Sequence, residues 1–160
     1  AIKKRDGSYE AYTDSGREST GVDALKWAVC AAELGAGELL VTSIDREGTG
    51  KGFDLELTRK IAESVSIPII ACGGAGQVSH VYNVATEGKA DAVCLASVLH
   101  YKFIEDQDLR NDFWEGGNTE YLKHRRRISN IHGATLTEIK EYLIARGIPC
   151  RPPVREGVPV

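Results

Sequence analysis

Apolar and polar residues alternate along this chain in two periods, one typical of strands and one typical of helices. Tyr9 to Thr13 alternate in the strand period, and residues 1–5 are a predicted hairpin partner across Asp6-Gly7, a common two-residue turn. Helical spacing follows over residues 20–35, 54–65 and 77–87, and apolar runs typical of buried strands lie at 38–43, 67–71 and 91–95. We therefore expect strands and helices to alternate.

The predicted strands begin near residues 38, 67 and 91, which fits βαβ units of about 30 residues joined by right-handed crossovers. We therefore expect an α/β fold with a parallel sheet. A (βα)8 barrel usually takes about 250 residues, whereas this chain has 160. The chain therefore looks like a (βα)4 half of a TIM barrel. A half barrel exposes two strand edges and one apolar face, so we expect completion by homodimerisation or by a separate N-terminal half.

Residues 1–160 are expected to form a single half-barrel domain with one inserted excursion at 102–133, where the periodicity is lost. The basic run at 123–127 in this excursion is expected to be a solvated surface cluster, with contact to a phosphate or nucleotide as the alternative. Thr135 and Glu138 predict a capping box for a further helix that ends at Gly147. Residues 148–160 are rich in proline and are expected to form a surface strap or a disordered tail.

Composition excludes some classes of protein. Hydrophobic residues make up 42% of the chain and charged residues 27%, which is ordinary for a globular domain. The net charge of −3 supplies no one-sign field that favours nucleic acid or a membrane surface. Neither a long apolar run nor an export leader is visible, so a cytoplasmic location is expected. No cofactor is expected. The four cysteines lack a C-x-x-C pair and are interpreted as reduced core thiols rather than a disulfide framework or a zinc site, so no metal is expected either: Cys30, Cys72, Cys94 and Cys150.

Two loops that follow predicted strands are candidates for binding an oxyanion. Gly73, Gly74 and Ala75 come directly after a strand and before a helix, whose N–H groups and positive dipole end point toward the loop. Ala96 and Ser97 repeat the arrangement one strand later, and barrels often build phosphate sites from two such neighbouring loops. The alternative is a tight turn that needs glycine for its conformation only.

Hydroxyl and carboxylate side chains follow other predicted strands. Thr42 and Ser43 end a strand, and Asp45 and Glu47 lie two residues apart in the next loop, so both carboxylates can face the barrel mouth. The alternative is a capped loop in which Asp45 accepts hydrogen bonds from nearby backbone N–H groups. The segment 14–16, with Ser15 and Gly16, similarly offers hydroxyl and N–H donors to a ligand or makes an Asx-type turn.

These motifs resemble the cyclase subunit of imidazole glycerol phosphate synthase. The resemblance rests on TSIDREGT at 42–49, GFD at 52–54, IIACGGAG at 69–76 and LASVLH at 95–100, with support from residues 12–16 and 35–38. It covers roughly three quarters of the chain, resumes in the final helix and matches the C-terminal half of the family barrel. The isomerase of the same pathway has the same architecture but matches residues 42–49 and 97–100 less well.

The resemblance implies a barrel of histidine biosynthesis that takes ammonia from a glutaminase subunit and closes the imidazole ring of a substrate with two phosphates. By position, Gly73, Gly74, Ala96 and Ser97 match one phosphate site, and Ala75 lies in the same loop. Ser15, Gly16, Ser43, Thr42 and Asp45 match the lining of the mouth, with Thr42, Asp45 and Glu47 as the catalytic candidates. Glu47 replaces the usual aspartate. Glu38, at the opposite end of its strand, matches an acidic residue that gates ammonia entry.

The sequence also departs from the family. One of the two catalytic aspartates of the family belongs to the N-terminal half, and an ungapped register places Ala1 at the other. Loss of a general acid or base typically slows an enzyme about 10²–10⁴-fold. The isolated chain is therefore not expected to run the cyclase reaction at a normal rate. The alternatives are a non-catalytic homodimer that binds a phosphosugar or phosphonucleotide, and a structural fragment whose loops only inherit their shape.

Overall fold

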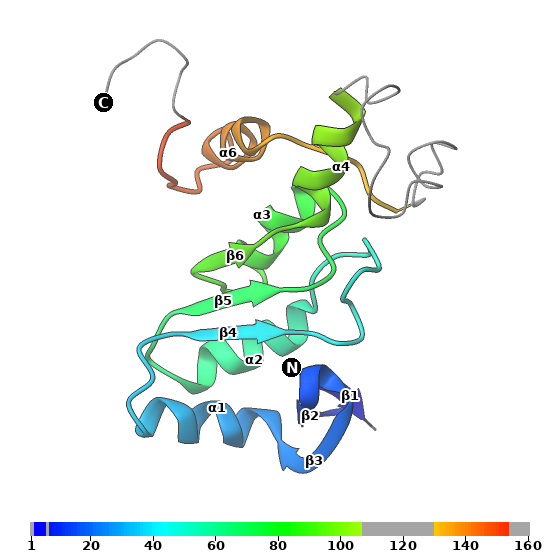
Figure 1. The fold of residues 1–160 in the computed structure, drawn as a ribbon. Helices are drawn as coiled ribbons and strands as arrows, with labels where there is room; N and C mark the ends of the chain where they lie inside the picture. Colours follow the sequence, from blue (N-terminus) through cyan, green and yellow to red (C-terminus); the bar gives the residue numbers. More distant parts are fainter. Residues whose placement is uncertain (1, 6, 107–129, 154–160) are drawn as a thin grey trace.

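The computed structural model of the chain describes residues 2–5, 7–106 and 130–153. Within these ranges the strands form two sheets of three strands each, and the first sheet is antiparallel (Figure 1). It consists of β1 (Ile2–Arg5), β2 (Ser8–Thr13) and β3 (Glu18–Asp23), in that order. The predicted hairpin of β1 and β2 is confirmed, with Lys3 opposite Glu10 in the register.

Strand β3 corrects the prediction that residues 20–23 begin a helix. The Thr20 hydroxyl donates to the carbonyl of Ala11 at 2.6 Å, and the Gly21 N–H donates to the Glu10 carboxylate at 2.9 Å. These bonds hold the segment in the sheet. The helix α1 (Ala24–Glu33) begins one residue after β3, where the Asp23 carboxylate accepts the N–H groups of Leu25 and Lys26.

The second sheet is parallel, as the sequence predicts, and has the order β4-β5-β6. Its elements alternate along the chain: β4 (Leu39–Thr42), α2 (Leu55–Ser64), β5 (Ile69–Cys72), α3 (Val78–Thr86), β6 (Ala92–Cys94) and α4 (Ser97–Asp106). At the amino ends of the strands, the Asp91 carboxylate accepts the Ile69 N–H at 2.8 Å, and the Asp91 N–H donates to the Ile69 carbonyl at 3.0 Å. The α/β class with a parallel sheet is therefore confirmed.

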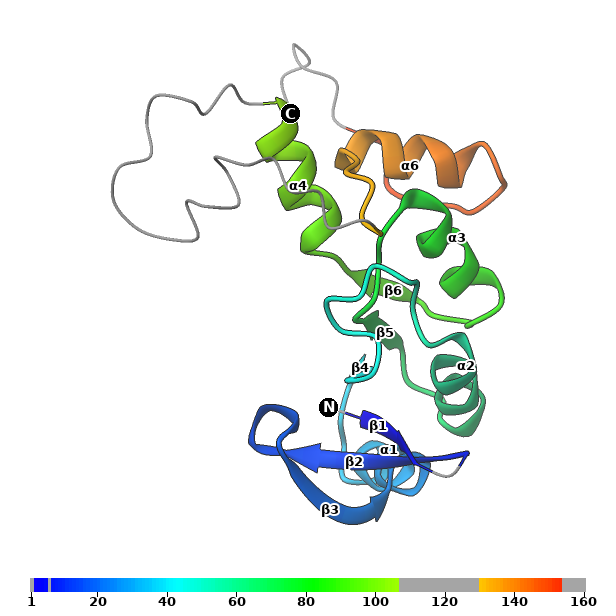
Figure 2. The ribbon, with the colours of Figure 1, turned by 90° about the vertical axis from the view of Figure 1, so that its right-hand side faces the viewer.

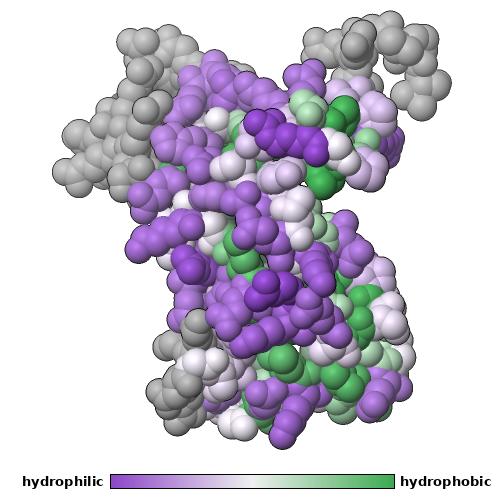
Figure 3. All heavy atoms as spheres, turned by 180° about the vertical axis from the view of Figure 1, so that it is seen from behind, coloured by the Kyte–Doolittle hydropathy of each residue, from purple (hydrophilic) through white to green (hydrophobic). Residues whose placement is uncertain are grey.

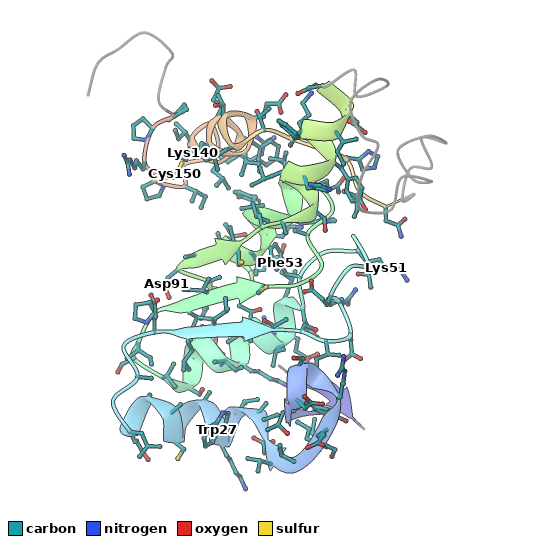
Figure 4. All side chains as sticks on the ribbon, in the orientation of Figure 1. Trp27, Lys51, Phe53, Asp91, Lys140 and Cys150 are labelled. Carbon is teal, nitrogen blue, oxygen red and sulfur yellow. The ribbon has the colours of Figure 1, made fainter. Side chains whose placement is uncertain are left out.

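Helix α6 (Leu136–Ile144) has the predicted capping box. The Glu138 N–H donates to the Thr135 hydroxyl at 3.1 Å, and the Thr135 N–H donates to the Glu138 carboxylate at 2.7 Å. This backbone hydrogen bond is the main reason that the pKa of Glu138 lies below its usual value. Beyond the helix, Cys150 packs beside α6, with its thiol 3.6 Å from the carbonyl of Lys140 (Figure 4).

The predicted excursion at 102–133 lies only in part within the described residues. Residues 102–106 continue helix α4, and residues 130–133 are built into the fold, with Ile131 buried. Residues 107–129, with the basic run at 123–127, lie outside the described part of the chain. The same holds for residues 154–160 of the predicted tail and for Ala1.

The parallel sheet has one covered and one open face. Alternate residues of the strands pack against helices, among them Val41, Ile69 and Ala71, each 5% exposed or less. The side chains of the intervening strand residues face away from α2 and α3, and Figure 2 shows these two helices together on one side of the sheet. Two register rows make up this open face: Leu40, Ile70 and Ala92, followed by Thr42, Cys72 and Cys94. Leu40 is 59% exposed, so the face is apolar and only partly buried.

The two sheets meet through α1 and α2. Tyr9 of β2 is buried with Ala28, Leu57 and Ile61, and its hydroxyl donates to the Asp54 carboxylate at 3.2 Å. Asp54 also caps α2, because it accepts the Leu57 N–H at 3.0 Å. Burial and the neighbouring carboxylates raise the pKa of Tyr9, so its hydroxyl keeps the proton that it donates.

The face seen in Figure 3 is mostly hydrophilic, with hydrophobic side chains gathered at the lower right, over α1. Trp27 of this helix is 52% exposed, and Leu34 at its end is 78% exposed. No helix in the described ranges is long and apolar enough to cross a membrane. The interpretation as core residues is wrong for Cys30 and Cys94, which are exposed, whereas Cys72 and Cys150 are half-buried and Cys150 packs against a core cluster. All four thiols are free.

Candidate phosphate-binding site

Three loops meet at the carboxyl ends of the parallel strands, residues 43–54 after β4, 73–77 after β5 and 95–96 after β6. They contain most of the residues that the sequence predicts for the site. At their base lies the row of Thr42, Cys72 and Cys94, the last residues of their strands. Lys51 projects from the first loop at this end of the sheet, whereas Asp91 lies at the opposite end (Figure 4).

The first two loops pack directly on each other. The Gly52 N–H donates to the carbonyl of Gly74 at 2.7 Å. A Cβ atom on Gly74 would overlap the Gly52 carbonyl oxygen, and one on Gly76 would overlap the carbonyl oxygen of Gly50. Gly74 also has a φ of +100°, which favours glycine. Contact between the loops is therefore sufficient to explain these glycines, without a ligand.

Gly73 lies beneath the carboxylate of Glu47. A Cβ atom on Gly73 would approach the Glu47 carboxylate to 2.9 Å and the Ser43 carbonyl oxygen to 3.0 Å. The turn is closed by the N–H groups of Arg46 and Glu47, which donate to the Ser43 carbonyl at 3.2 and 3.0 Å. The structure thus brings Glu47 and Gly73 together. Asp45, in the same turn, is exposed.

Ser43 does not lie on the surface of the mouth. The residue is 3% exposed, and its buried hydroxyl has no hydrogen-bond partner among the described residues. Thr42, its neighbour, is half-buried on the open face. Of the two hydroxyl side chains that end β4, Thr42 is therefore better placed to reach a ligand.

Ala96 and Ser97 lie at the start of α4, where Ala96 is exposed and Ser97 is half-buried. The helix is anchored by Val98, which is 1% exposed and whose carbonyl accepts the Ala134 N–H at 3.2 Å. The first N–H groups of a helix have no partner within it and carry a partial positive charge. This end of α4 therefore offers donors to an anion beside the loop of Gly73.

The remaining predicted residues lie elsewhere. Ser15 and Gly16 belong to the 3-10 turn η1 (Asp14–Gly16) of the antiparallel sheet, where Ser15 is exposed with a φ of +54°. Glu38 is exposed directly before β4, at the amino ends of the parallel strands. It is therefore separated from the three loops by the length of the sheet, as the sequence predicts.

Residues 130–134 close over the loops, which the sequence did not indicate. The His132 N–H donates to the carbonyl of Gly76 at 2.7 Å, and the side-chain amide of Asn130 donates to the carbonyl of Thr49 at 3.4 Å. A Cβ atom on Gly133 would meet the backbone N of Lys102 at 2.6 Å. The segment therefore joins both loops to α4. Its signal in the sequence was weak, because Gly133 follows a long stretch without periodicity.

His80 of α3 supports the second loop through its ring. The Gly76 N–H donates to Nδ1 of His80 at 3.1 Å, a bond that requires an unprotonated Nδ1. Burial, followed by the nearby His132, lowers the pKa of His80. The folded chain therefore binds this proton less readily than the unfolded chain, in which the pKa of histidine is about 6.5.

We expect the free energy of unfolding to fall as the pH drops below about 6.5, because the unfolded chain then binds more protons at His80. His80→Asn keeps an acceptor and removes the titration, so its stability is expected to vary less between about pH 6.5 and 5. The measurement is urea unfolding across this range, with His100→Asn at an exposed position as control. Parallel pH profiles for all three chains would contradict the assignment.

A pocket of about 430 Å³ opens between the first loop, α2 and α3. None of the predicted site residues line it, and it carries both signs of charge. The Asp54 carboxylate already accepts two hydrogen bonds, and Glu56 pairs with Lys60 at 2.8 Å. Within the described ranges, no group of three His, Cys, Asp or Glu side chains is arranged to hold a metal ion. The residues that line the 430 Å³ pocket are Arg46, Lys51, Gly52, Phe53, Asp54, Leu55, Glu56, His80 and Asn83.

Comparison with known proteins places this architecture in a family. The family description "Histidine biosynthesis protein" matches residues 1–105. The imidazole glycerol phosphate synthase subunit HisF of Trichormus variabilis is 56% identical over 103 residues, which are 64% of this chain and 40% of that protein. The HisF subunit of Pyrobaculum aerophilum is 53% identical over 109 residues, which are 68% of this chain and 43% of the relative. In Saccharolobus solfataricus, the HisF subunit is 52% identical over 110 residues, 69% of this chain and 44% of the relative.

These relatives are longer than the part that is shared. The chain spans less than half the length of the curated relatives that it matches. The family match ends at residue 105, near the end of α4 (Ser97–Asp106), so the segment 130–134 and helix α6 lie beyond that match.

Proposed function

Because the chain belongs to the histidine biosynthesis protein family, we propose that it is the C-terminal, phosphate-binding part of an imidazole glycerol phosphate synthase cyclase subunit. In this proposal, a (βα)8 barrel closes the imidazole ring of a ribonucleotide with two phosphates, using ammonia from a glutaminase subunit. The loops of Gly73 and Ser97 hold one phosphate. Thr42, Asp45 and Glu47 line the mouth beside it, and Glu38 faces the ammonia entrance at the other end.

The single observation that carries the proposal is the open face of the parallel sheet. Parallel sheets are ordinarily covered on both faces. Among the described residues, no helix lies over the row of Leu40, Ile70 and Ala92, and Leu40 is accordingly 59% exposed. In a closed barrel this row would point into the interior, and the row of Thr42 and Cys72 would lie at the mouth. Further strands are therefore needed to bury the face.

The experiment adds the missing strands. The chain is mixed with the N-terminal half of the HisF subunit of Trichormus variabilis, and solution mass and ammonia-dependent turnover are measured. We expect a one-to-one complex and a turnover at least about 10²-fold above that of either part, because a general acid or base is typically worth that much. A chain that stays monomeric in the presence of the added half and binds no hydrophobic dye would overturn the proposal.

The control in this experiment is the chain without the added half. It also tests a second candidate function, that of a homodimeric binding protein. Two copies related by a two-fold axis would also cover the open face and would place two identical phosphate sites at one mouth. A stable homodimer that binds a bisphosphate without turnover would favour a binding protein over a cyclase. The same apolar row of Leu40 and Ile70 supports this candidate.

A further inference from the structure

Two cysteines end neighbouring strands at the base of the three loops. Cys72 of β5 and Cys94 of β6 are register partners in the parallel sheet. Residues opposite each other on adjacent strands direct their side chains to the same face, and strands lie about 4.8 Å apart. A disulfide spans Cα atoms about 4.4–6.8 Å apart. The backbone therefore already holds both thiols within the reach of a disulfide.

The surroundings of the pair make the two thiols unequal. Cys94 is exposed, whereas Cys72 is half-buried between Thr42 and Cys94. Burial raises the pKa of the Cys72 thiol, a hydrogen bond with Thr42 opposes this shift, and the adjacent Cys94 thiol adds to it. Because the two cysteines are register partners, both side chains lie on the same open face of the sheet. An exposed thiol reacts first with a reagent from solution, and the half-buried thiol is positioned to react second.

We propose that Cys72 and Cys94 form a reversible dithiol–disulfide site at the mouth of the parallel sheet, oxidised by a low-molecular-weight disulfide such as glutathione disulfide. The Cys94 thiolate attacks one sulfur of glutathione disulfide, which breaks its S–S bond and releases one glutathione thiolate that takes up a proton. Cys72 then loses its proton to solvent and attacks the Cys94 sulfur, which releases the second glutathione. Two protein thiols are oxidised, and one glutathione disulfide is reduced to two glutathione molecules.

The position of the site gives the disulfide a structural consequence. Cys72 directly precedes Gly73, and Cys94 lies two residues before Ala96. A covalent bond between the cysteines fixes the spacing between the second and third loops. This inference concerns the thiols alone and stands whether or not the loops bind phosphate.

The test incubates the full chain with glutathione disulfide, blocks free thiols, digests with trypsin and identifies linked peptides by mass spectrometry. Cleavage after Lys60, Lys89 and Lys102 places Cys72 in peptide 61–89 and Cys94 in peptide 90–102. We expect these two peptides to be linked to each other, and we expect reducing agent to separate them. Peptides linked mainly through Cys30 or Cys150 would overturn the proposal.

A second measurement uses variants. In Cys72→Ser, the mixed disulfide at Cys94 has no neighbour to displace it, so the glutathione adduct at Cys94 is expected to be at least about 10-fold more abundant than in the wild-type chain. The adduct at the exposed Cys30 serves as the internal control, because it should be equal in both chains. Equal adducts at Cys94 in both chains, or free thiols at both cysteines while Cys30 reacts, would refute the site.

Discussion

Replacing Gly74 with alanine is expected to lower the free energy of unfolding by about 2–5 kcal/mol, a large part of the stability of an ordinary domain. The new methyl group would overlap the carbonyl oxygen of Gly52 and lie 2.8 Å from the Cβ atom of Arg46. The φ of +100° adds strain, because L side chains rarely adopt this conformation. Neither loop can move away easily, since the Gly52 N–H is bonded to the Gly74 carbonyl.

The matched control is Gly35→Ala. Gly35 has nearly the same φ, +98°, but no atom of the described residues lies within 4 Å of its added methyl group. Gly35→Ala is therefore expected to lower the free energy of unfolding by the conformational strain alone, about 1–2 kcal/mol. Urea unfolding of both variants separates strain from overlap. Equal losses in the two variants would show that the contact between the loops of Gly52 and Gly74 is not rigid.

Ser97→Asp is expected to weaken binding of a ribose bisphosphate about 10–100-fold while leaving the fold at least as stable. Ser97 is the first residue of α4, where a carboxylate is stabilised by the positive end of the helix dipole. The same carboxylate removes a hydroxyl donor and repels a phosphate at this helix end. A hydrogen bond to a charged group contributes about 1.5–3 kcal/mol, and each 1.4 kcal/mol is about tenfold in affinity.

The control for this variant is Ser66→Asp, which adds the same charge at an exposed position near the amino end of β5. Isothermal titration measures the affinity, and urea unfolding measures the stability. Equal weakening in both variants would mean that net charge, rather than a site at Ser97, decides binding. A large loss of stability in Ser97→Asp would instead show that this helix end is packed against protein.

Much of the parallel sheet could be predicted from the sequence because its signals are local. Thr135 caps its helix as predicted, and Asp54 lies at the start of the predicted helical spacing and caps α2; both signals need only residues three positions away. Apolar runs give β4 to β6 because parallel strands are apolar on both faces. The run at 69–72 ends directly before two glycines, which fixes the end of β5.

Strand β3 could not be predicted in the same way. Its residues are polar and mostly exposed, with Ser19, Thr20 and Gly21 in succession, so no alternation marks it. The strand depends on bonds to Glu10 and Ala11, which are distant in sequence. The sequence pattern predicts a helix from residue 20, whereas helix α1 begins at Ala24, after the Asp23 cap.

The roles of the glycines and cysteines could not be predicted from local sequence. The glycines depend on contacts between loops, and the burial of the cysteines depends on which face of the sheet the helices cover. The sequence allows phosphate binding or a tight turn for Gly73 and Gly74. In the structure, Gly52 lies close to Gly74, and Ser43 and Glu47 lie close to Gly73, contacts that need no ligand. Apolar neighbours suggested that Cys72 and Cys94 lie in the core. In the fold, alternation along β5 and β6 turns both toward the open face. Burial could not be assigned without knowing which face the helices cover.

The measurement that tests the central claim most directly is isothermal titration of the wild-type chain with a ribose bisphosphate, with solution mass recorded before and after. If the loops of Gly73 and Ser97 form a phosphate site, saturable binding is expected, and inorganic phosphate should compete for it. Ser97→Asp should weaken the binding, and Ser66→Asp should leave it unchanged. Absence of saturable binding by a folded chain, alone and after addition of the N-terminal half, would contradict the account.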